Sequence, residues 1–594
     1  MLNPEQEKAV RHTGGPLLIL AGPGSGKTTM IVHRLQELLR RGTDPKTILV
    51  VTYTKAAAQE MRSRFLRFVG TEQSQIRFGT LHSFFWQILS EQHRISGWRM
   101  MEEDEAILTA AEVLRQEQET RQEQETRQEQ ELPEDEALFV AEQELDRYRY
   151  ERSRMLPHTN ESFAAAFEER KRGRRMLDYD DILSLAVGLL KRNPAIAKRY
   201  RDRYRHILVD EYQDINPVQY EGLKLLAGRR GNLFAVGDDD QSIYGFRGSD
   251  PGLLLRFSED FDNAGILRLS ANYRSTPEIV DFAAAIIARN RERYEKNIHA
   301  VRAHGKYVEK RAYKDEREES LAIADWAKRL RHPENCAILY RSIYDAAHLC
   351  RTFDDSGINY RLKEDGMNPY RHWIGEDILN YAKAAQGDGQ AFAGILKRPQ
   401  RGIPSGILTW LRQGVDPQEL LQMPLGTEYR IKLEELLYHL RKLRNEEPGK
   451  GISRIYSRLE YRRFLEDFAE EQKLPYKRLR DRFLFFQELA RSCDNWQDYE
   501  RKLSRGREQH QADSPVGIRI MTLHASKGLE FDQVWIPQIE SGTLPHERAD
   551  SLEEERRLLY VGCTRARDGL ILSRARYRGG GPKKPSVFWR ELPR

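Results

Sequence analysis

Short apolar runs alternate with longer stretches of helical periodicity along the first part of the chain. LLIL (residues 17–20), ILVV (48–51), HILVDE (206–211) and NLFAVGD (232–238) have the length and apolar content of buried strands. Strand-like runs separated by helical stretches are typical of parallel strands joined by helical crossovers. This pattern predicts an α/β fold with a doubly wound parallel sheet.

A second group of runs predicts another sheet of the same kind, interrupted in sequence. Its members are GILRLS (265–270), CAILYR (336–341), GIRIMTLH (517–524), FDQVWIPQI (531–539) and GLILSRAR (569–576). Segments rich in charge and helix formers interrupt both groups, and we expect them to form mainly helical insertions. The predicted division is a first core of residues 1–88 and 179–264 with insertion 89–178, and a second core of residues 265–370 and 512–594 with insertion 371–511.

The first insertion contains a six-residue repeat, RQEQETRQEQETRQEQE, at residues 115–131. Glu117 with Arg121, and Glu123 with Arg127, form favourable i,i+4 pairs, so a helix is expected. Six residues turn a helix by about 600°, so equivalent positions define no constant apolar face. The repeat is therefore either an arm that binds a partner or sets a spacing, or a solvated helix lengthened by tandem duplication, and we favour the second. After it, Asp178 in LDYDDIL is expected to cap a helix.

The charge and the cysteine content of the chain exclude only a few classes of protein. The 594 residues include 97 Lys and Arg against 91 Asp and Glu, a net charge of +6, so a phosphate-binding surface must be a local patch. Four cysteines without a CxxC pair argue against zinc or an iron–sulfur cluster and for reduced thiols. No apolar run approaches the roughly 20 residues of a membrane span, and Met1 leads into a motif and not a signal peptide. We expect a cytoplasmic protein with no membrane partner.

The segment AGPGSGKTT, residues 21–29, has the spacing of a phosphate-binding loop. Gly22, Gly24 and Gly26 let backbone amides converge on phosphate oxygens at a helix start. Lys27 supplies a charge to the β and γ phosphates, and Thr28 supplies a hydroxyl to magnesium. The remaining members of the expected nucleotide-binding loop are Pro23, Ser25 and Thr29.

Two carboxylates, Asp210 and Glu211, follow the apolar run of ILVDEYQD. This is the position expected at the carboxyl end of a buried parallel strand. Asp210 would hold Mg²⁺, and Glu211 would orient and deprotonate the attacking water. An acid that activates water indicates hydrolysis of the nucleotide and not transfer of its phosphate to a second substrate.

Four further segments follow in order: VGDDDQSIYGFRGSD (236–250), LRLSANYRST (267–276), MTLHASKGLEF (521–531) and EEERRLLYVGCTRAR (553–567). Together with the two segments above, they resemble the motifs of superfamily 1 DNA helicases of the UvrD, Rep and PcrA kind. The resemblance covers most of the chain. It implies two RecA-like P-loop cores, ATP and Mg²⁺ as cofactors, and an inserted subdomain in each core.

The resemblance also assigns nucleotide contacts residue by residue. Gln6 is expected to pair with the adenine edge, so ATP would be preferred over GTP, and Tyr273 would stack on the base. Arg274 and Arg565 resemble the two arginines that neutralise charge on the γ-phosphate, an effect worth roughly 10³ to 10⁵ in rate in related enzymes. Two further residues complete the set: Gln241 would sense the γ-phosphate and link it to DNA, and Glu530 would contact the ribose.

Single-stranded DNA is the track that the resemblance implies. Phe246 is the best candidate for stacking on a base, with Arg247 beside it, and such stacking is worth about 1–3 kcal/mol per base without distinguishing sequence. For Tyr53, contact with DNA and packing in the core are equally expected. The other candidates for DNA contact are His82, His524 and Lys527. Expected partners are single-stranded DNA and junctions with duplex, bound by a monomer or a weak DNA-induced dimer.

Two positions depart from the family pattern. Lys55 and Ala56 replace the usual asparagine–lysine pair, which changes the expected strand contact there. Pro404 stands where the duplex-gripping hairpin commonly has glycine, and proline has no amide to donate to a phosphate. The sequence hypothesis is an ATP-dependent DNA helicase that moves 3′ to 5′. Its alternatives are a DNA-stimulated translocase that unwinds poorly and an ATP-gated DNA-binding module.

Overall fold

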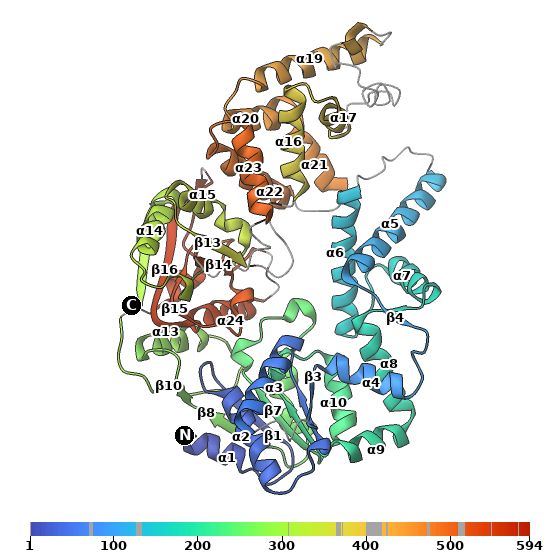
Figure 1. Cartoon of the computed structure of the whole chain (residues 1–594), viewed down its shortest axis with the longest axis vertical. Helices are drawn as coiled ribbons and strands as arrows, with labels where there is room; N and C mark the ends of the chain where they lie inside the picture. The colour runs from blue at the N-terminus through green and yellow to red at the C-terminus, as the bar shows by residue number, and fades with distance from the viewer. Residues whose placement is uncertain are drawn as a thin grey trace. The chain divides into compact units, whose positions relative to one another are not determined.

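Figure 1 shows the computed structural model of the chain, whose backbone divides into two compact units. The structure describes residues 2–593 except 70–74, 126–133, 307, 364–369, 371, 400–418, 423–425, 472–475, 509–516, 548, 550 and 580. Unit 1 consists of residues 1–308, 549–569 and 591–594, and unit 2 of residues 309–548 and 570–590.

A six-stranded parallel sheet forms the centre of unit 1, in the order β3-β2-β6-β7-β1-β8. Its strands are β1 (Leu17–Ala21), β2 (Ile48–Val51), β3 (Arg77–Gly79), β6 (His206–Val209), β7 (Asn232–Gly237) and β8 (Gly265–Leu269). The phosphate-binding loop follows β1, and the carboxylate pair follows β6, two strands away. The predicted doubly wound sheet is therefore confirmed.

Both faces of this sheet are buried, as alternate residues of single strands show. Leu17 and Ile19 pack in one hydrophobic cluster, while Leu18 and Leu20 pack in another. Because successive side chains of a strand point to opposite faces, two separate cores must cover the sheet. One core involves α2 (Lys27–Arg40) and α3 (Lys55–Val69), and the other involves α4 (Leu81–Glu91), α8 (Tyr179–Arg192) and α10 (Pro217–Ala227).

Strand β8 corrects one prediction. GILRLS was assigned from its apolar pattern to the second group of strands, but Leu17–Ala21 pairs in parallel with Gly265–Leu269. The run therefore extends the first sheet at its edge. Apolar content predicts a strand but not its neighbour, because the neighbour is chosen by long-range packing.

The first insertion is helical, with α5 (Glu103–Glu125), α6 (Glu134–Ser153) and α7 (Glu161–Gly173) around a small core of its own. Part of the six-residue repeat lies in α5, as expected, and residues 126–131 lie outside the described residues. Asp178 is the N-cap of α8, with its carboxylate accepting from the Asp181 amide at 2.8 Å, so the capping prediction is confirmed. The buried Lys171 Nζ donates to the Asp178 carboxylate at 2.5 Å and to the Asp181 carboxylate at 2.9 Å, which joins α7 to α8.

The remaining elements of unit 1 are mostly short. They are α1 (Pro4–Val10), η1 (Pro45–Thr47), β4 (Arg99–Met100), β5 (Met176–Leu177), α9 (Pro194–Arg203), η3 (Tyr212–Asp214), η4 (Asp239–Gln241), η5 (Gly245–Arg247), α11 (Pro251–Leu255), α12 (Phe257–Asp260), β9 (Ala271–Asn272), α13 (Pro277–Ile287), β10 (His299–Ala300) and α24 (Leu552–Cys563). The two 3-10 turns η4 and η5 follow the carboxyl end of β7.

A second, mainly parallel sheet lies in unit 2, in the order β11-β16-β15-β12-β14-β13, with β17 paired antiparallel to β16. Its strands are β11 (Glu309–Asp315), β12 (Cys336–Tyr340), β13 (Tyr360–Lys363), β14 (Ile518–Thr522), β15 (Phe531–Ile536), β16 (Ala566–Arg578) and β17 (Gly581–Pro582). Helices α14 (Glu316–Lys328) and α15 (Ala347–Asp355) supply residues to its core. A second α/β sheet was predicted, and this is confirmed.

The second insertion is helical over its described residues. It contains α16 (Trp373–Ala385), α17 (Gly389–Lys397), α19 (Thr427–Leu443), α20 (Pro448–Arg458), α21 (Tyr461–Glu471), α22 (Tyr476–Arg491) and α23 (Trp496–Glu508). The segment RGIPSGIL with Pro404 lies outside the described residues. In the part of the chain that the structure describes, no helix has the length and apolar content to cross a membrane.

All four cysteines are buried and none forms a disulfide: Cys336, Cys350, Cys493 and Cys563. Burial raises the pKa of the Cys493 thiol to about 11, and it raises the pKa values of Cys350 and Cys563 further. No group of three or more potential metal-ligating His, Cys, Asp or Glu side chains occurs among the described residues.

Candidate active site

The phosphate-binding loop joins β1 to α2 within unit 1. Gly26 is the N-cap of α2 with φ of 78°, and Gly24 has φ of 68°, both in the left-handed region that favours glycine. A Cβ at Gly24 would lie 2.7 Å from the Arg274 Cβ, and one at Gly22 would lie 2.5 Å from the Ile298 Cδ1. The sequence assigned these glycines to phosphate approach, and the structure adds a second reason: neighbouring segments pack against the loop.

Lys27 and Glu211 face each other across this site. The Lys27 Nζ lies 3.4 Å from the Glu211 Oε1. Burial by itself would lower the pKa of Lys27, but Glu211, Asp210 and Asp238 outweigh it and hold the pKa above its ordinary value. Glu211 has φ of 52°, a strained conformation for a non-glycine residue that places its carboxylate beside the loop.

Asp210 directly follows β6 and precedes Glu211. Its amide donates to the Val51 carbonyl at 2.9 Å, which continues the ladder of β6 with β2. Burial, and then the Glu211 charge, raise the pKa of Asp210 to about 7. The positive charge near Asp210 is therefore too small to balance the two carboxylates of Asp210 and Glu211. A divalent cation would supply the missing positive charge, and carboxylate oxygens are ligands that such a cation binds.

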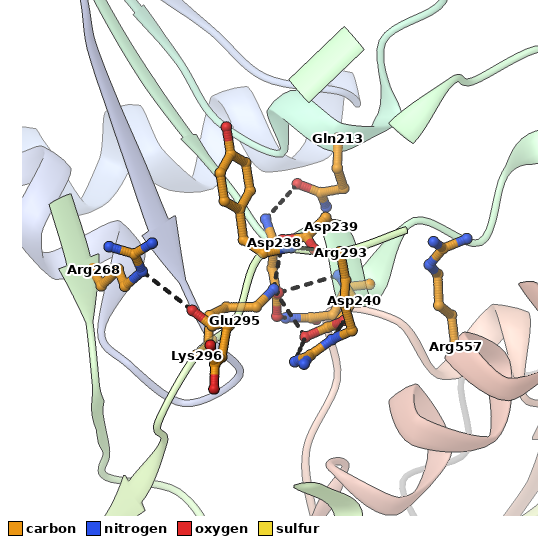
Figure 2. A network of polar contacts seen from close by, with 12 residues as sticks. Gln213, Asp238, Asp239, Asp240, Arg268, Arg293, Glu295, Lys296 and Arg557 are labelled. Atoms are coloured by element: carbon orange, nitrogen blue, oxygen red, sulfur yellow. Dashed lines mark hydrogen bonds and ion pairs between the residues drawn. The ribbon is translucent and has the colours of Figure 1, made fainter. Parts of the chain in front are cut away.

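Gln213 links Glu211, the carboxylate predicted to activate water, to the turn after β7, and sequence reasoning did not single it out. Its Nε2 donates to the Glu211 Oε2 at 2.5 Å, and its Oε1 accepts from the Asp238 amide at 2.9 Å. Figure 2 shows this amide side chain beside the turn that contains Asp238. Gln213 stands two residues after Glu211 in DEYQD, so the sequence shows that the two are close. The sequence does not show that Gln213 also accepts from Asp238, which follows β7.

Gln241 and Arg565 meet on the same side of this network. The Gln241 Nε2 donates to the Asp238 Oδ2 at 2.6 Å, and its Oε1 accepts from the Arg565 Nη2 at 3.3 Å. The Arg565 Nε donates to the Val561 carbonyl at 2.9 Å. Burial, followed by repulsion from Arg274, lowers the pKa of Arg565 to about 9, so its guanidinium stays charged at neutral pH.

Arg274 approaches the same place from the NYRS segment. Its Nη1 donates to the Thr564 carbonyl at 3.2 Å, next to Arg565. Arg565 was expected from the second core, yet residues 549–569 belong to the compact unit that holds Lys27. The structure thus brings Lys27, Glu211, Gln241, Arg274 and Arg565 into one unit.

The two residues predicted to contact adenine, Gln6 and Tyr273, also lie beside the loop, and their polar atoms have protein partners. The Gln6 Nε2 donates to the Ser25 carbonyl at 2.8 Å, and its Oε1 accepts from the Asn3 amide at 3.0 Å in a capping box. Asn3 donates in turn to the Tyr273 hydroxyl at 2.9 Å. Tyr273 remains 42% exposed, which leaves its ring open to a stacking partner. Gln6 therefore holds the loop in this structure.

Asn272 fixes the NYRS segment to the loop, and the sequence analysis missed it. Its Nδ2 donates to the Pro23 carbonyl at 2.8 Å, while its Oδ1 accepts from the amides of Arg274 and Ser275, each at 2.9 Å. The Tyr273 amide adds a bond to the Gly24 carbonyl at 2.9 Å. These hydrogen bonds fix the backbone position from which the Arg274 side chain extends.

Three consecutive buried aspartates follow β7 and surround one lysine. The Lys296 Nζ lies 2.7, 2.5 and 2.8 Å from carboxylate oxygens of Asp238, Asp239 and Asp240. Figure 2 shows Lys296 pointing into this turn, with Arg293 pairing with Asp240 at 2.7 Å. Burial raises the pKa of Asp239, whereas Lys296 overcomes the same effect at Asp238 and holds its pKa below the usual value.

The candidate DNA residues of the first core form an aromatic cluster. The Tyr53 ring stacks on Tyr244 with centroids 5.4 Å apart and 7° between the planes, and Tyr244 meets Phe246 edge-on at 6.1 Å. The Arg247 guanidinium lies 5.4 Å from the Phe246 centroid. Phe246 is 54% exposed, an unusual state for a large apolar ring and one that suits a stacking surface.

His82 lies outside this cluster. Its ring meets Tyr179 edge-on at 5.4 Å, and Tyr179 is exposed. Burial lowers the pKa of His82 to about 4, so the ring is neutral at pH 7. His82, Tyr53 and Glu211 line one small cavity, which connects the candidate DNA side to the candidate hydrolytic side.

The remaining predicted site residues lie in unit 2. His524 belongs to the 3-10 turn after β14, Lys527 is its C-cap, and Glu530 is exposed just before β15. The structure places these three residues on one connection of the second sheet.

Comparisons with known proteins identify the family to which this geometry belongs. The model of the UvrD/REP helicase N-terminal domain matches residues 2–262, and that of the UvrD-like helicase C-terminal domain matches residues 267–422 and 459–577. The chain belongs to the UvrD-like helicase family. These two matches account for both α/β sheets and imply two RecA-like cores.

Relatives in this family resemble the chain over nearly its whole length. The DNA helicase II of Escherichia coli is 31% identical, with 100% of this chain and 87% of that protein covered. The ATP-dependent DNA helicase PcrA of Staphylococcus aureus is 30% identical, with coverages of 100% and 86%. The putative ATP-dependent DNA helicase YjcD of Bacillus subtilis is 30% identical, with coverages of 99% and 80%.

Proposed function

We propose that the protein is an ATP-dependent DNA helicase that moves 3′ to 5′ along single-stranded DNA and separates duplex, in DNA repair, replication restart or recombination. The observation that carries the proposal is the joint placement of Lys27, Glu211, Gln241 and Arg565 in one network. The polarity and the setting come from the family resemblance.

ATP supplies the phosphoryl group whose loss releases energy for movement. Lys27 holds the β and γ phosphates at the start of α2, where the loop amides also point. Glu211 takes a proton from water, and Gln213 keeps its carboxylate in place through the 2.5 Å hydrogen bond. Arg274 and Arg565 neutralise charge as the terminal phosphate departs.

Thr28 and Asp210 would hold Mg²⁺ in this scheme. The fit rests on donor chemistry, since a hydroxyl and a carboxylate are the ligands that Mg²⁺ prefers. The raised pKa of Asp210 fits as well, because its charge lacks sufficient compensation from Lys27. Loss of the Asp210 carboxylate should therefore remove hydrolysis at any magnesium concentration tolerated by the protein.

Phe246, with Tyr244 and Arg247, would contact bases of the single strand. Stacking on a π face does not depend on base identity, which suits a motor that must pass every sequence. Gln241 and Phe246 lie five residues apart in one segment, so the same segment reaches both the nucleotide network and the exposed ring. This arrangement supports coupling of ATP turnover to stepping.

The decisive experiment measures ATP hydrolysis with and without single-stranded DNA, beside displacement from duplexes with a 3′ or a 5′ tail. Strong stimulation with displacement from the 3′ tail alone is the expected result. Stimulation without displacement would instead favour a translocase that remodels protein–DNA complexes, the alternative suggested by Pro404. Slow turnover that DNA does not stimulate would favour the ATP-gated binding module and contradict the motor.

A further inference from the structure

Helix α24, which leads to Arg565, also contacts the loop that carries Phe246. Glu554 lies in the first turn of α24, with its amide donating to the N-cap Ser551 hydroxyl at 3.2 Å. Its Oε1 accepts a hydrogen bond from the Gly245 amide at 2.9 Å. Gly245 begins the turn η5, and Phe246 is the next residue.

This contact leaves no room for a side chain. A Cβ at Gly245 would lie 2.3 Å from the Glu554 Oε2, so the carboxylate rests directly on the loop backbone. A hydrogen bond to a charged acceptor is stronger than one between neutral groups. The loop is therefore held at its glycine by one side chain of α24.

The same helix holds the other end of the segment. Arg565, two residues beyond the end of α24, donates to the Gln241 Oε1 at 3.3 Å. The residues from Gln241 to Gly245 are thus fixed at one end by Arg565 and at the other by Glu554. A helix of 12 residues is about 18 Å long and stiff, so movement at its first turn reaches its last.

We propose that Glu554 is a positioning residue that couples DNA on the Phe246 loop to the placement of Arg565 and Gln241 at the nucleotide. The proposal rests on the proposed function, because it takes Phe246 as the base contact. A base that stacks on Phe246 displaces the loop backbone, and the Gly245–Glu554 hydrogen bond passes that displacement to α24. Without the bond, the loop moves and α24 stays.

Glu554 could instead serve only as an acidic residue that favours the helix N-terminus. Two substitutions separate these roles. Glu554→Gln removes the charge but keeps an oxygen that accepts from the Gly245 amide, whereas Glu554→Ala removes both. Glu278→Ala is the matched control, since Glu278 lies in the first turn of α13 and accepts from the Gly305 amide at 3.1 Å, away from the Phe246 loop.

The experiment measures kcat and KM for ATP without DNA and across a range of single-stranded DNA concentrations. We expect Glu554→Ala to lower the ratio of DNA-stimulated to DNA-free kcat about tenfold, the size of one charge-assisted hydrogen bond, with KM for ATP little changed. Glu554→Gln should keep most of the ratio, and Glu278→Ala all of it. An unchanged ratio in Glu554→Ala, or an equal loss in Glu554→Gln or Glu278→Ala, would overturn the coupling role.

Phe246→Ala tests the underlying function separately. If that variant binds and responds to DNA like the parent protein, the assignment of Phe246 fails whatever Glu554 does. If Phe246→Ala weakens both DNA binding and the stimulation of hydrolysis by DNA, the double variant Phe246→Ala with Glu554→Ala tests whether Phe246 and Glu554 act through the same route. A double variant no worse than Phe246→Ala supports a shared route, and fully additive losses contradict it.

Discussion

Glu211 combines an unusual backbone conformation with a carboxylate held from two sides. Lys27 approaches one of its oxygens and Gln213 donates to the other. If Glu211 is the general base that we propose, these two contacts would orient its carboxylate toward one position, and a proton acceptor must lie within hydrogen-bond reach of the water it activates. The left-handed φ of 52° is strain that the fold maintains at this residue.

Glu211→Gln should retain ATP binding and lose hydrolysis by about 10²- to 10⁴-fold, because an amide fills the same space but accepts no proton. Binding of a fluorescent ATP analogue and phosphate release measure the two effects. Glu221→Gln, on α10 beside Lys191, is the control and should hydrolyse normally. Normal turnover in Glu211→Gln would show that another group activates water.

Gly24 and Gly42 form a natural pair for testing why the loop needs glycine. Both have positive φ, but a Cβ at Gly42 meets nothing within 4 Å, whereas one at Gly24 meets Arg274 and Asn272. Alanine at either position should cost about 1–2 kcal/mol from its conformation. Only Gly24→Ala should also weaken ATP binding and slow hydrolysis, as titration and steady-state kinetics would reveal; equal effects would mean that conformation alone matters.

At the scale of elements, the segment after β7 depends on charge neutralisation. Three buried carboxylates converge on Lys296, and they also determine where Gln241 lies through Asp238. Removing one partner from a buried ionic group leaves the others unpaired, which is costly. Lys296 therefore matters to the site although it stands 55 residues after Gln241.

Lys296→Met should lower the free energy of unfolding by about 3–5 kcal/mol at pH 7. The loss should grow from pH 5 to pH 8. Without Lys296, burial raises the pKa values of Asp238 and Asp239, so these carboxyls take up protons at low pH and become unpaired charges as pH rises. Urea denaturation of the parent protein and the variant at pH 5 and pH 8 measures this loss in the free energy of unfolding. Lys198→Met, which breaks the exposed pair with Asp202, should cost at most about 1 kcal/mol, and a similar cost at Lys296 would contradict the buried network.

The sequence predicted most strands and the nucleotide loop because both depend on local patterns. Apolar runs and glycine spacing carry their own signal, whereas GILRLS was placed in the wrong sheet because its neighbour Leu17 is distant in sequence. Lys296 and Asn272 escaped prediction for the same reason: their partners lie 58 and 249 residues away. Glu211 and Lys27 could be proposed from the sequence because each follows a local signal, an apolar run for Glu211 and the glycine-rich loop for Lys27.

At the scale of the whole molecule, the contacts among the candidate catalytic residues all fall within unit 1. That unit is assembled from separate stretches of chain, since residues 549–569 return to it after unit 2. The stretch includes Arg565, so the phosphate-binding loop and its distant arginine belong to one contact unit. Nucleotide binding should consequently stabilise unit 1 more than unit 2.

A non-hydrolysable ATP analogue with Mg²⁺ at 100 times its Kd should stabilise unit 1 by about 2.7 kcal/mol. Hydrogen exchange should slow at residues 17–35, 206–214 and 555–569, with a smaller change across α16 and α22. Lys27→Ala should abolish the effect. Equal protection of both units would show instead that nucleotide stabilises the chain as one cooperative body.

The four buried cysteines have a practical consequence for following this motor. Maleimides attack thiolates, and burial denies them access to all four thiols. The raised pKa values of Cys350, Cys493 and Cys563 also keep those three thiols protonated. Cysteines introduced at exposed Leu108 on α5 and Ile431 on α19 should therefore take up a donor and an acceptor dye while the native thiols stay silent. A fluorescent reporter of inter-unit distance during ATP turnover can be built on the natural sequence without first removing a single cysteine.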